Sequence, residues 1–430
     1  MTGILWATVA IVLVPSVVGF SAPAHAAETP AAADPGAAPD VAAGAPAPPP
    51  SPAPPVAPPP AEEPAVTTFR PSGRAQTMDD VVSGLTAELA IRNVRSRYTL
   101  NFFGDTSLSA GTPAAPDHHL GFAIGAQDVL IKGELGKHLT ALTEFAVESG
   151  DSGFGIDVER FSVRWQSGPL YLEAGRTHTA LGYWNNAYHH GRWLQLAIAR
   201  PRWVAFEDDG GLLPVHWVGV TSGAKLDLGT GTLHLIASIG NGRGKIVDDV
   251  RNTGDYQSLK AIQAGAEYVG LHWPDLRIGI AAVLDRIPPQ GGVDRPALPD
   301  QSIDELIGAA HIAYASVPLI LIAESYLVVH RAAGQQWSTY GGFLLAGYAF
   351  GQFTPYVEVE RIASRGGNDP FFVPDPSAVG AASFDTVKGI AGLRMDLSDW
   401  TALKAEYRNT RYLDTSTGLQ EVVLNWSWGF

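Results

Sequence analysis

The stretch STGLQEVVLNWSWGF, residues Ser416 to Phe430, alternates between apolar and polar side chains. One set of alternate residues is apolar: Val422, Leu424, Trp426, Trp428 and Phe430. The other set is mostly polar: Glu421, Val423, Asn425, Ser427 and Gly429. Because a strand places successive side chains on opposite faces, the stretch predicts a strand with one face suited to lipid. An edge strand of a soluble sandwich has the same period and is the alternative.

This pattern resembles the C-terminal strand of bacterial outer-membrane β-barrels. In that family the final aromatic residue closes the barrel and serves as the assembly signal. The resemblance therefore implies this role for Trp426, Trp428 and Phe430, with outer-membrane lipid and the barrel-assembly machinery as partners. We expect the closing strand to pair with the first strand near Tyr98 to Phe102, so that no backbone group faces lipid unpaired.

The N-terminal residues 1–26 read as a secretory signal peptide. An apolar run from Ile4 to Phe20 is followed by Ala24-His25-Ala26, a small-x-small cleavage site, although no Lys or Arg precedes the run. The chain contains no cysteine, which excludes disulfides and thiolate chemistry. Its formal net charge of −14 disfavours a role in binding nucleic acid.

Residues 27–75 are rich in proline and alanine and predict a disordered periplasmic leader. If Pro46 to Pro60 adopts polyproline II, it spans roughly 45 Å at ~3.1 Å per residue. A spacer or a ligand for a partner protein is the functional alternative to a plain disordered leader. Residues 76–96 form a short lead-in, in which the amphipathic patch from Met78 to Ile91 predicts a helical turn or two.

Residues 97–430 predict an all-β fold, a transmembrane antiparallel β-barrel of about sixteen strands. Short turns are expected at residues 135–137, 166–169, 227–231, 273–275, 316–318, 351–352 and 398–399. Longer polar links are expected at residues 110–118, 149–153, 179–214, 241–257, 288–302, 332–336, 363–383 and 414–418. A strict alternation of short and long connections is typical of a bacterial outer-membrane barrel, with tight periplasmic turns and longer outer loops.

Assigning faces by alternation places charged residues of both signs on the inner side of the strands. The predicted lumen-lining residues are Arg160, Arg164, Lys225, Glu267, Glu358, Glu360, Lys388, Arg394, Lys404 and Arg408. Charges facing lipid at mid-bilayer cost roughly 2–4 kcal/mol, so this segregation favours a wet lumen. Pairing of these charges to fill a closed barrel is the alternative, but about sixteen strands leave an interior too wide for side chains to fill.

The third long link, Thr179 to Pro214, carries more aromatic side chains than an exposed loop needs. Together with the strand pattern of residues 97–430, it resembles the general and phosphate-selective porins of Gram-negative bacteria. The resemblance implies that the link folds into the lumen as a constriction, and a loop covering the barrel mouth is the alternative. The implied constriction residues are His189, His190, Arg192, Arg200, Arg202, Glu207, Asp208 and Asp209. The three carboxylates would face Arg160 and Arg164 across the pore.

The resemblance implies an outer-membrane porin, a passive diffusion channel for small hydrophilic solutes or ions. A homotrimer is the assembly that the resemblance suggests. His178, His189 and His190 lie on a link without a helical i, i+4 pair, so we expect no metal site. We expect neither a cofactor nor an enzyme, because no nucleophile elbow or comparable catalytic signature is present. A structural or tethering barrel, a hydrophobic-solute transporter and an outer-membrane hydrolase are the remaining alternatives.

Overall fold

A computed structural model of the chain describes residues 86–91, 94–112, 120–150, 153–189, 191–206, 210–244, 255, 258–270, 275–289, 301–366, 369, 371–372, 385–413 and 417–430. The predicted signal peptide and proline-rich leader lie outside the described residues. Among the described residues, no helix combines the length and the apolar character that crossing a membrane requires.

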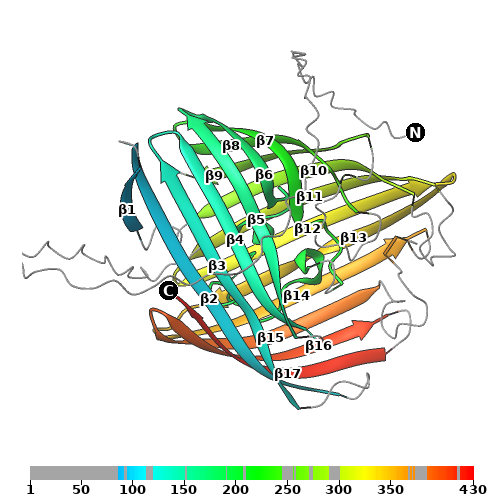
Figure 1. The fold of residues 1–430 in the computed structure, drawn as a ribbon. Helices are drawn as coiled ribbons and strands as arrows, with labels where there is room; N and C mark the ends of the chain where they lie inside the picture. The colour runs from blue at the N-terminus through cyan, green and yellow to red at the C-terminus, as the bar shows by residue number, and fades with distance from the viewer. Residues whose placement is uncertain are drawn as a thin grey trace, which may run out of the picture. The chain divides into compact units, whose positions relative to one another are not determined.

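In the described part of the chain, strands β2 to β17 form a closed antiparallel barrel of sixteen strands (Figure 1). Each strand pairs with its neighbours in sequence, and β17 pairs with β2. The strands are β2 Val94–Gly111, β3 Gly121–Leu135, β4 Leu139–Gly150, β5 Gly153–Ser167, β6 Leu170–His178, β7 His216–Asp227, β8 Gly231–Gly240, β9 Ala261–Gly270, β10 Leu276–Ile287, β11 Ile303–Ser316, β12 Leu319–Ala332, β13 Gln335–Tyr348, β14 Phe353–Arg365, β15 Thr386–Ser398, β16 Thr401–Tyr412 and β17 Thr417–Gly429. The predicted fold class and strand number are confirmed.

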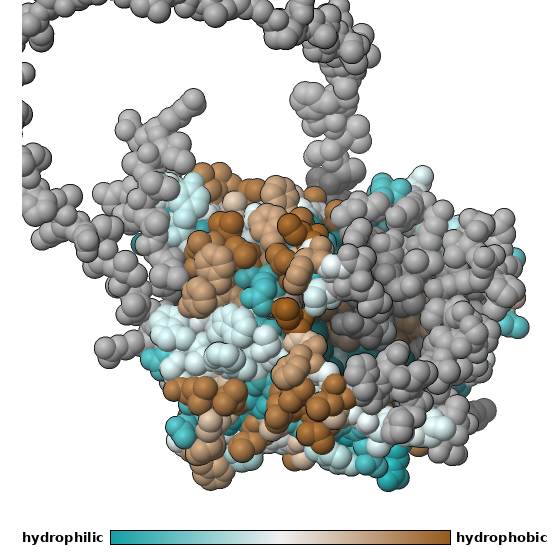
Figure 2. All heavy atoms as spheres, turned by 60° about the horizontal axis from the view of Figure 1, so that its bottom comes forward, coloured by the Kyte–Doolittle hydropathy of each residue, from teal (hydrophilic) through white to brown (hydrophobic). Residues whose placement is uncertain are grey.

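The alternation in the sequence decides which face of each strand points outward. In β17, Leu424 and Trp426 are exposed on the outer face, whereas Asn425 and Ser427 are buried on the inner face. Apolar residues on other strands behave in the same way, and Phe161 of β5 is 62% exposed. Figure 2 shows the resulting brown apolar patches on the surface of the molecule. A closed barrel with an apolar outer face fits a lipid bilayer, because every strand edge is paired and the outer side chains need no water.

The barrel closes along the seam between β17 and β2, where residues from Gly429↔Phe103 to Glu421↔Gly111 are paired. Just beyond, the backbone N–H of Phe430 donates to the carbonyl of Phe102 at 2.9 Å, and the reciprocal bond measures 2.7 Å. The aromatic rings of these two residues have centroids 5.6 Å apart. We expected β17 to pair with Tyr98 to Phe102. It pairs instead with Phe103 to Gly111, further along β2.

The first part of β2 is paired with an additional strand, β1 Thr86–Ile91, from Thr86↔Thr99 to Ile91↔Val94. Because Ser96 also pairs with Leu135 of β3, β1 occupies the edge of β2 that β17 does not reach. The helical turn predicted up to Ile91 is wrong for these residues. An exposed strand edge presents unpaired backbone groups, and pairing with β1 satisfies them.

Connections at the two ends of the barrel differ in length, but less regularly than the sequence predicted. Short turns join β3 to β4, β5 to β6, β7 to β8, β11 to β12, β13 to β14 and β15 to β16. At the opposite end, β4 ends at Gly150 and β5 begins at Gly153, and only Ala333 and Gly334 separate β12 from β13. The predicted strict alternation is therefore wrong at these two hairpins. Ala333 and Gly334 have φ values of 53° and 77°, as a tight two-residue hairpin turn requires.

Deleting Phe430 is expected to reduce the fraction of folded barrel. The deletion removes two backbone hydrogen bonds and a ring contact at the end of the seam, where unpaired groups facing lipid cost several kcal/mol each. Heat-modifiable migration in gel electrophoresis measures the folded fraction. The variant Phe430→Tyr is the matched control and should fold normally. Equal folded fractions for the deletion and the native chain would contradict the role of this residue.

Candidate functional site

The third long link, from Thr179 to Pro214, lies against the inner wall of the barrel. Figure 1 shows its short helix α2 (Trp184–Ala187) within the ring of strands, and the link also contains the 3-10 helix η1 (Arg202–Val204). Its large side chains in the described part are buried: Leu181, Tyr183, Trp184, Tyr188, Trp193, Leu194, Leu196, Ile198, Trp203, Leu212 and Leu213. With inner-face residues of the strands, many of them form one hydrophobic cluster.

Carboxylates of the wall accept hydrogen bonds from the backbone of this link. Glu324 of β12 accepts from the N–H groups of Trp184 at 2.6 Å and Tyr183 at 3.2 Å. The hydroxyl of Tyr326 also donates to Glu324. Burial raises the pKa of the Tyr183 phenol well above its usual 10.0, so the Tyr183 side chain stays neutral.

Two further carboxylates on the same side of the barrel also accept hydrogen bonds from the backbone of the link. Glu406 of β16 accepts from the N–H of Ile198 at 2.5 Å, and Glu360 of β14 accepts from the N–H of Trp203 at 3.2 Å. The link thus has acceptors for its backbone donors at three separate points. Because buried N–H groups need partners, these carboxylates fix the path of the link.

Cations of the wall bind the backbone carbonyl groups of the link. The ammonium group of Lys404 donates to the carbonyls of Arg192 at 2.5 Å and Gln195 at 2.6 Å. The guanidinium group of Arg394 donates to the carbonyl of Trp193 at 2.6 Å and also to that of Gln195 at 3.1 Å. Charged side chains from β12 to β16 thus replace the regular hydrogen bonds that the link backbone lacks.

Aromatic packing complements these polar contacts. Trp203 stacks on Tyr326, with ring centroids 5.3 Å apart, and its indole N–H donates to the carbonyl of Arg361 at 3.0 Å. Trp184 meets Phe343 edge to face at 6.0 Å. The aromatic richness of the link is therefore explained by burial.

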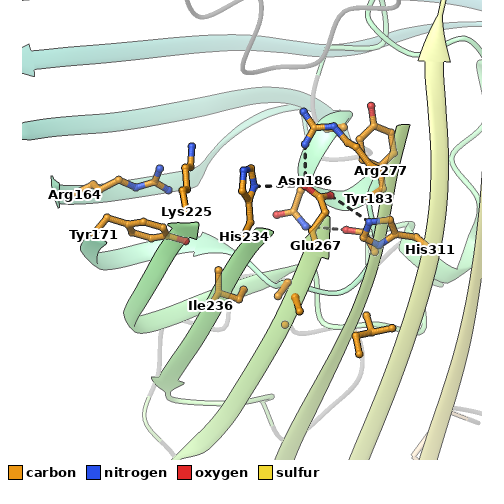
Figure 3. Close-up of a pocket in the computed structure, with 16 residues that line it drawn as sticks. Arg164, Tyr171, Tyr183, Asn186, Lys225, His234, Ile236, Glu267, Arg277 and His311 are labelled. Carbon is orange, nitrogen blue, oxygen red and sulfur yellow. Dashed lines mark hydrogen bonds and ion pairs between the residues drawn. The ribbon is translucent and has the colours of Figure 1, made fainter. Parts of the chain in front are cut away.

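On the other side of the link, a cavity of about 320 Å³ separates it from the wall of β5 to β11 (Figure 3). Its polar wall side chains come from neighbouring strands: Arg164, Tyr171, Lys225, His234, Glu267, Arg277 and His311. Tyr183 and Asn186 line it from the link. The link thus packs against β12 to β16 and leaves this space along β5 to β11.

Glu267 of β9 is at the centre of the charged groups in the cavity. Its carboxylate accepts from Arg277 at 2.9 Å and lies 3.2 Å from Nε2 of His311. Nδ1 of His234 is 3.7 Å from the same carboxylate (Figure 3). These residues occupy inward positions on four adjacent strands, and one carboxylate therefore serves several cationic or neutral donors.

Two further positively charged side chains line the cavity, and only one of them is paired with a carboxylate in the described part of the chain. Arg164 pairs with Glu173 at 2.7 Å, and its guanidinium carbon lies 4.5 Å from the ring centroid of Tyr171. Lys225 is exposed and makes no ion pair with any described residue. With Arg277 paired to Glu267, Lys225 supplies the excess positive charge of this wall.

The predicted constriction residues occupy several different environments. His189 is buried, and Arg192 reaches Asp105 of β2 at 3.2 Å. Arg200 donates to the carbonyl of His189 at 2.6 Å, and Arg202 donates to that of Gly210 at 3.3 Å. His190, Glu207, Asp208 and Asp209 lie outside the described residues.

Only part of the predicted lumen lining faces the cavity. Arg164, Lys225 and Glu267 line it. Glu360, Arg394 and Lys404 bind the link backbone as described above, as does Lys388, at 3.5 Å from the carbonyl of Arg200. The other predicted residues are Arg160, paired with Glu144 at 2.5 Å, Arg408, paired with Glu406 at 2.7 Å, and the buried Glu358.

Sequence reasoning missed His234 and His311 as cavity residues, although both alternate in register with neighbouring inward positions. It also missed that His178 and His189 meet a third histidine, His216, with ligand atoms within 4.8 Å of one another. His216 begins β7 at the far end of the link, so no local spacing connects it with His178. The predicted absence of a metal site rested on the spacing within the link alone.

Replacing Glu324 with Ala is expected to release the link from the wall. The buried N–H groups of Tyr183 and Trp184 and the hydroxyl of Tyr326 would lose their acceptor, each at a cost of about 1–3 kcal/mol. Trypsin should then cleave the folded protein faster after Arg192 and Arg202, each of which precedes a tryptophan. Glu134→Ala is the matched control, because Glu134 is only partly buried and pairs with Lys132 at 2.8 Å instead of with the link. Unchanged cleavage of the Glu324 variant would show that the link is held by other contacts.

The sequence matches no protein-family model and no curated protein. Several solved structures are similar in fold. An anion-selective porin from Comamonas acidovorans is 13% identical, with a TM-score of 0.56 over 78% of this chain and 100% of that chain. The outer membrane channel DcaP of Acinetobacter baumannii is 13% identical, with a TM-score of 0.53 over 80% and 100% of the two chains.

The trimer form of OmpT, an outer membrane protein of Vibrio cholerae, is 10% identical, with a TM-score of 0.53 over 78% of this chain and 99% of that chain. At these identities the likeness concerns the fold. The barrel is sixteen-stranded and closed, and its outer face is apolar. The chain therefore has the fold of the outer-membrane porins and the surface of an integral outer-membrane protein.

Proposed function

We propose that the chain is a passive diffusion channel for small hydrophilic solutes or ions. The observation that carries the proposal is the charged cavity between the third link and the wall of β5 to β11, inside a closed barrel. Arg164, Lys225, Glu267 and Arg277 around this cavity favour water and ions over apolar solutes. The porin and channel among the structures of similar fold support the same function.

In this proposal the third link sets the width of the passage. The link is anchored to β12, β14, β15 and β16 through Glu324, Glu360, Arg394 and Lys404, so it is held at a fixed distance from the opposite wall. Solutes would pass on the free side, along β5 to β11. The proposal requires no chemical turnover and no cofactor.

The wall of the cavity carries an excess of positive charge, which favours anions on this side of the passage. The similar porin from Comamonas acidovorans is described as anion-selective. Glu207, Asp208 and Asp209 of the link add negative charge whose effect opposes that of Lys225. The selectivity of the channel then follows from the balance between these two groups.

Outer-membrane lipid and the barrel-assembly machinery are the partners that this function needs, and a homotrimer is its proposed assembly. One of the similar structures is described as a trimer form. Chemical cross-linking of the protein in native membranes tests the assembly. The absence of a trimer band would limit the proposal to a single-chain channel.

Planar-bilayer recording tests the channel function directly, and charge reversal at Lys225 tests its location. Lys225→Glu is expected to move the reversal potential in a salt gradient toward cation preference, because fixed charges in a narrow passage bias ion permeation. The shift should shrink between ~0.1 M and ~1 M salt, as the Debye length falls from ~10 Å to ~3 Å. Lys137→Glu, with the same charge change in an exposed turn, is the control. No conductance in the native protein would refute the channel.

Shortening the link tests whether it restricts the passage. Excision of most of Asn185 to Arg202 is expected to raise single-channel conductance, and neutralising Glu207, Asp208 and Asp209 is expected to move the reversal potential toward anion preference. Heat-modifiable migration checks that each variant still folds. If both measurements match the native protein, the link does not form the constriction, whereas the channel itself would stand.

A further inference from the structure

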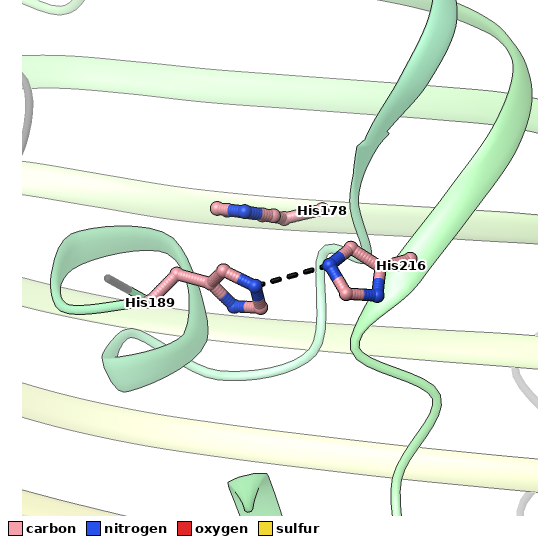
Figure 4. A group of neighbouring side chains, drawn as sticks. All are labelled: His178, His189 and His216. Carbon is pink, nitrogen blue, oxygen red and sulfur yellow. Dashed lines mark hydrogen bonds between the residues drawn. The ribbon is translucent and has the colours of Figure 1, made fainter. Parts of the chain in front are cut away.

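Three histidines meet where the third link leaves and rejoins the barrel wall (Figure 4). His178 ends β6 and His216 begins β7, and the two residues are directly paired in the sheet. His189 follows helix α2 and reaches the same point from the link. Their ligand atoms all lie within 4.8 Å of one another, and His189 and His216 are only 1% and 3% exposed.

A carboxylate completes the group. The carboxylate oxygen Oε2 of Glu159 on β5 lies 2.6 Å from Nε2 of His216 and 3.5 Å from Nε2 of His189. The pairing of β4 and β5 shifts register between Glu144 and Phe145, and both Glu159 and Arg160 are buried at this point. Three imidazoles and one carboxylate therefore converge from three strands and the link.

The distances among these atoms need an electropositive partner. Nε2 of His189 and Nε2 of His216 are 3.1 Å apart, and two lone pairs cannot face each other at that distance without a proton or a cation between them. Zinc bonds nitrogen at about 2.0–2.1 Å in a tetrahedral site, which places neighbouring ligand atoms about 3.3 Å apart. The separations of 3.1 and 3.5 Å lie on either side of this value, whereas the 2.6 Å between Oε2 of Glu159 and Nε2 of His216 is a hydrogen-bond distance that would lengthen when a metal binds.

The tautomer of His189 is set by a neighbouring amide. Nδ2 of Asn185 donates to the carbonyl of Val215 at 3.1 Å, so its Oδ1 is the atom that faces Nδ1 of His189 at 3.0 Å. Nδ1 of His189 therefore carries the hydrogen, and Nε2 presents its lone pair to the cluster. A hydrogen bond of this kind to the second nitrogen is typical of metal-binding histidines.

We propose that His178, His189, His216 and Glu159 bind one divalent transition metal of the zinc class, which attaches the third link to β5, β6 and β7. Imidazole and carboxylate ligands suit Zn²⁺, and four protein ligands make a closed site that stabilises structure. The alternative occupant is a single proton shared between His189 and His216, with Glu159 as its counter-ion. The site stands independently of the channel function, because it concerns only the attachment of the link.

Metal titration of the purified full-length protein in detergent tests the site. After chelator treatment, isothermal titration with Zn²⁺ should show one equivalent bound per chain, and Co²⁺ should give the intense visible absorption of a tetrahedral site that Zn²⁺ abolishes. Binding by His189→Gln and His216→Gln should be at least 100-fold weaker, and binding by Asn185→Ala 10- to 100-fold weaker. His138→Gln, which changes an exposed turn histidine, should bind like the native protein.

Heat-modifiable migration identifies variants that fail to fold, and the Co²⁺ spectrum of the native protein needs no variant. Less than one equivalent of Zn²⁺, or a weak octahedral Co²⁺ spectrum, would overturn the metal site in favour of the shared proton. Equal Zn²⁺ affinity in the native protein and in the His189→Gln and His216→Gln variants would also overturn the metal site, because Zn²⁺ would then bind elsewhere.

Discussion

A backbone with almost no regular structure can be buried only if its N–H and C=O groups find other partners. The third link is such a backbone, and the rest of the site depends on how the barrel wall supplies those partners. Glu324, Glu360 and Glu406 accept from the link, whereas Arg394 and Lys404 donate to it. Inward charges of the barrel wall thus serve as fixed donors and acceptors.

The charges that bind the link lie on β12 to β16 and on β2 and β3, whereas the cavity with Lys225, Glu267 and Arg277 lies along β5 to β11. The same class of residue therefore has two roles, which depend on whether the link or solvent is its neighbour. Under the proposed channel function, a mutation of an inward charge should alter link attachment on β12 to β16 and ion passage along β5 to β11.

Local sequence patterns were enough to predict the barrel. The alternation in β17 gives the faces of Trp426 and Asn425 because a period of two depends only on neighbouring residues. The site was less predictable, since its contacts join residues far apart in sequence, such as Trp184 and Glu324. The alternation identified the charged face but could not show that Lys404 would bind the link backbone. Nor could the spacing of His178 and His189 reveal that His216 would join them.

The link also crosses the seam at which the barrel closes. The N–H of Gly191 donates to Asp128 of β3 at 3.0 Å, and Arg192 bonds Asp105 of β2, while the carbonyl of Arg192 accepts from Lys404 of β16. One short segment thus connects β2 and β3 on one side of the seam with β16 on the other, from within the barrel. During assembly these contacts can form only after the two ends of the sheet have met. Docking of the link should therefore slow the reopening of the finished barrel.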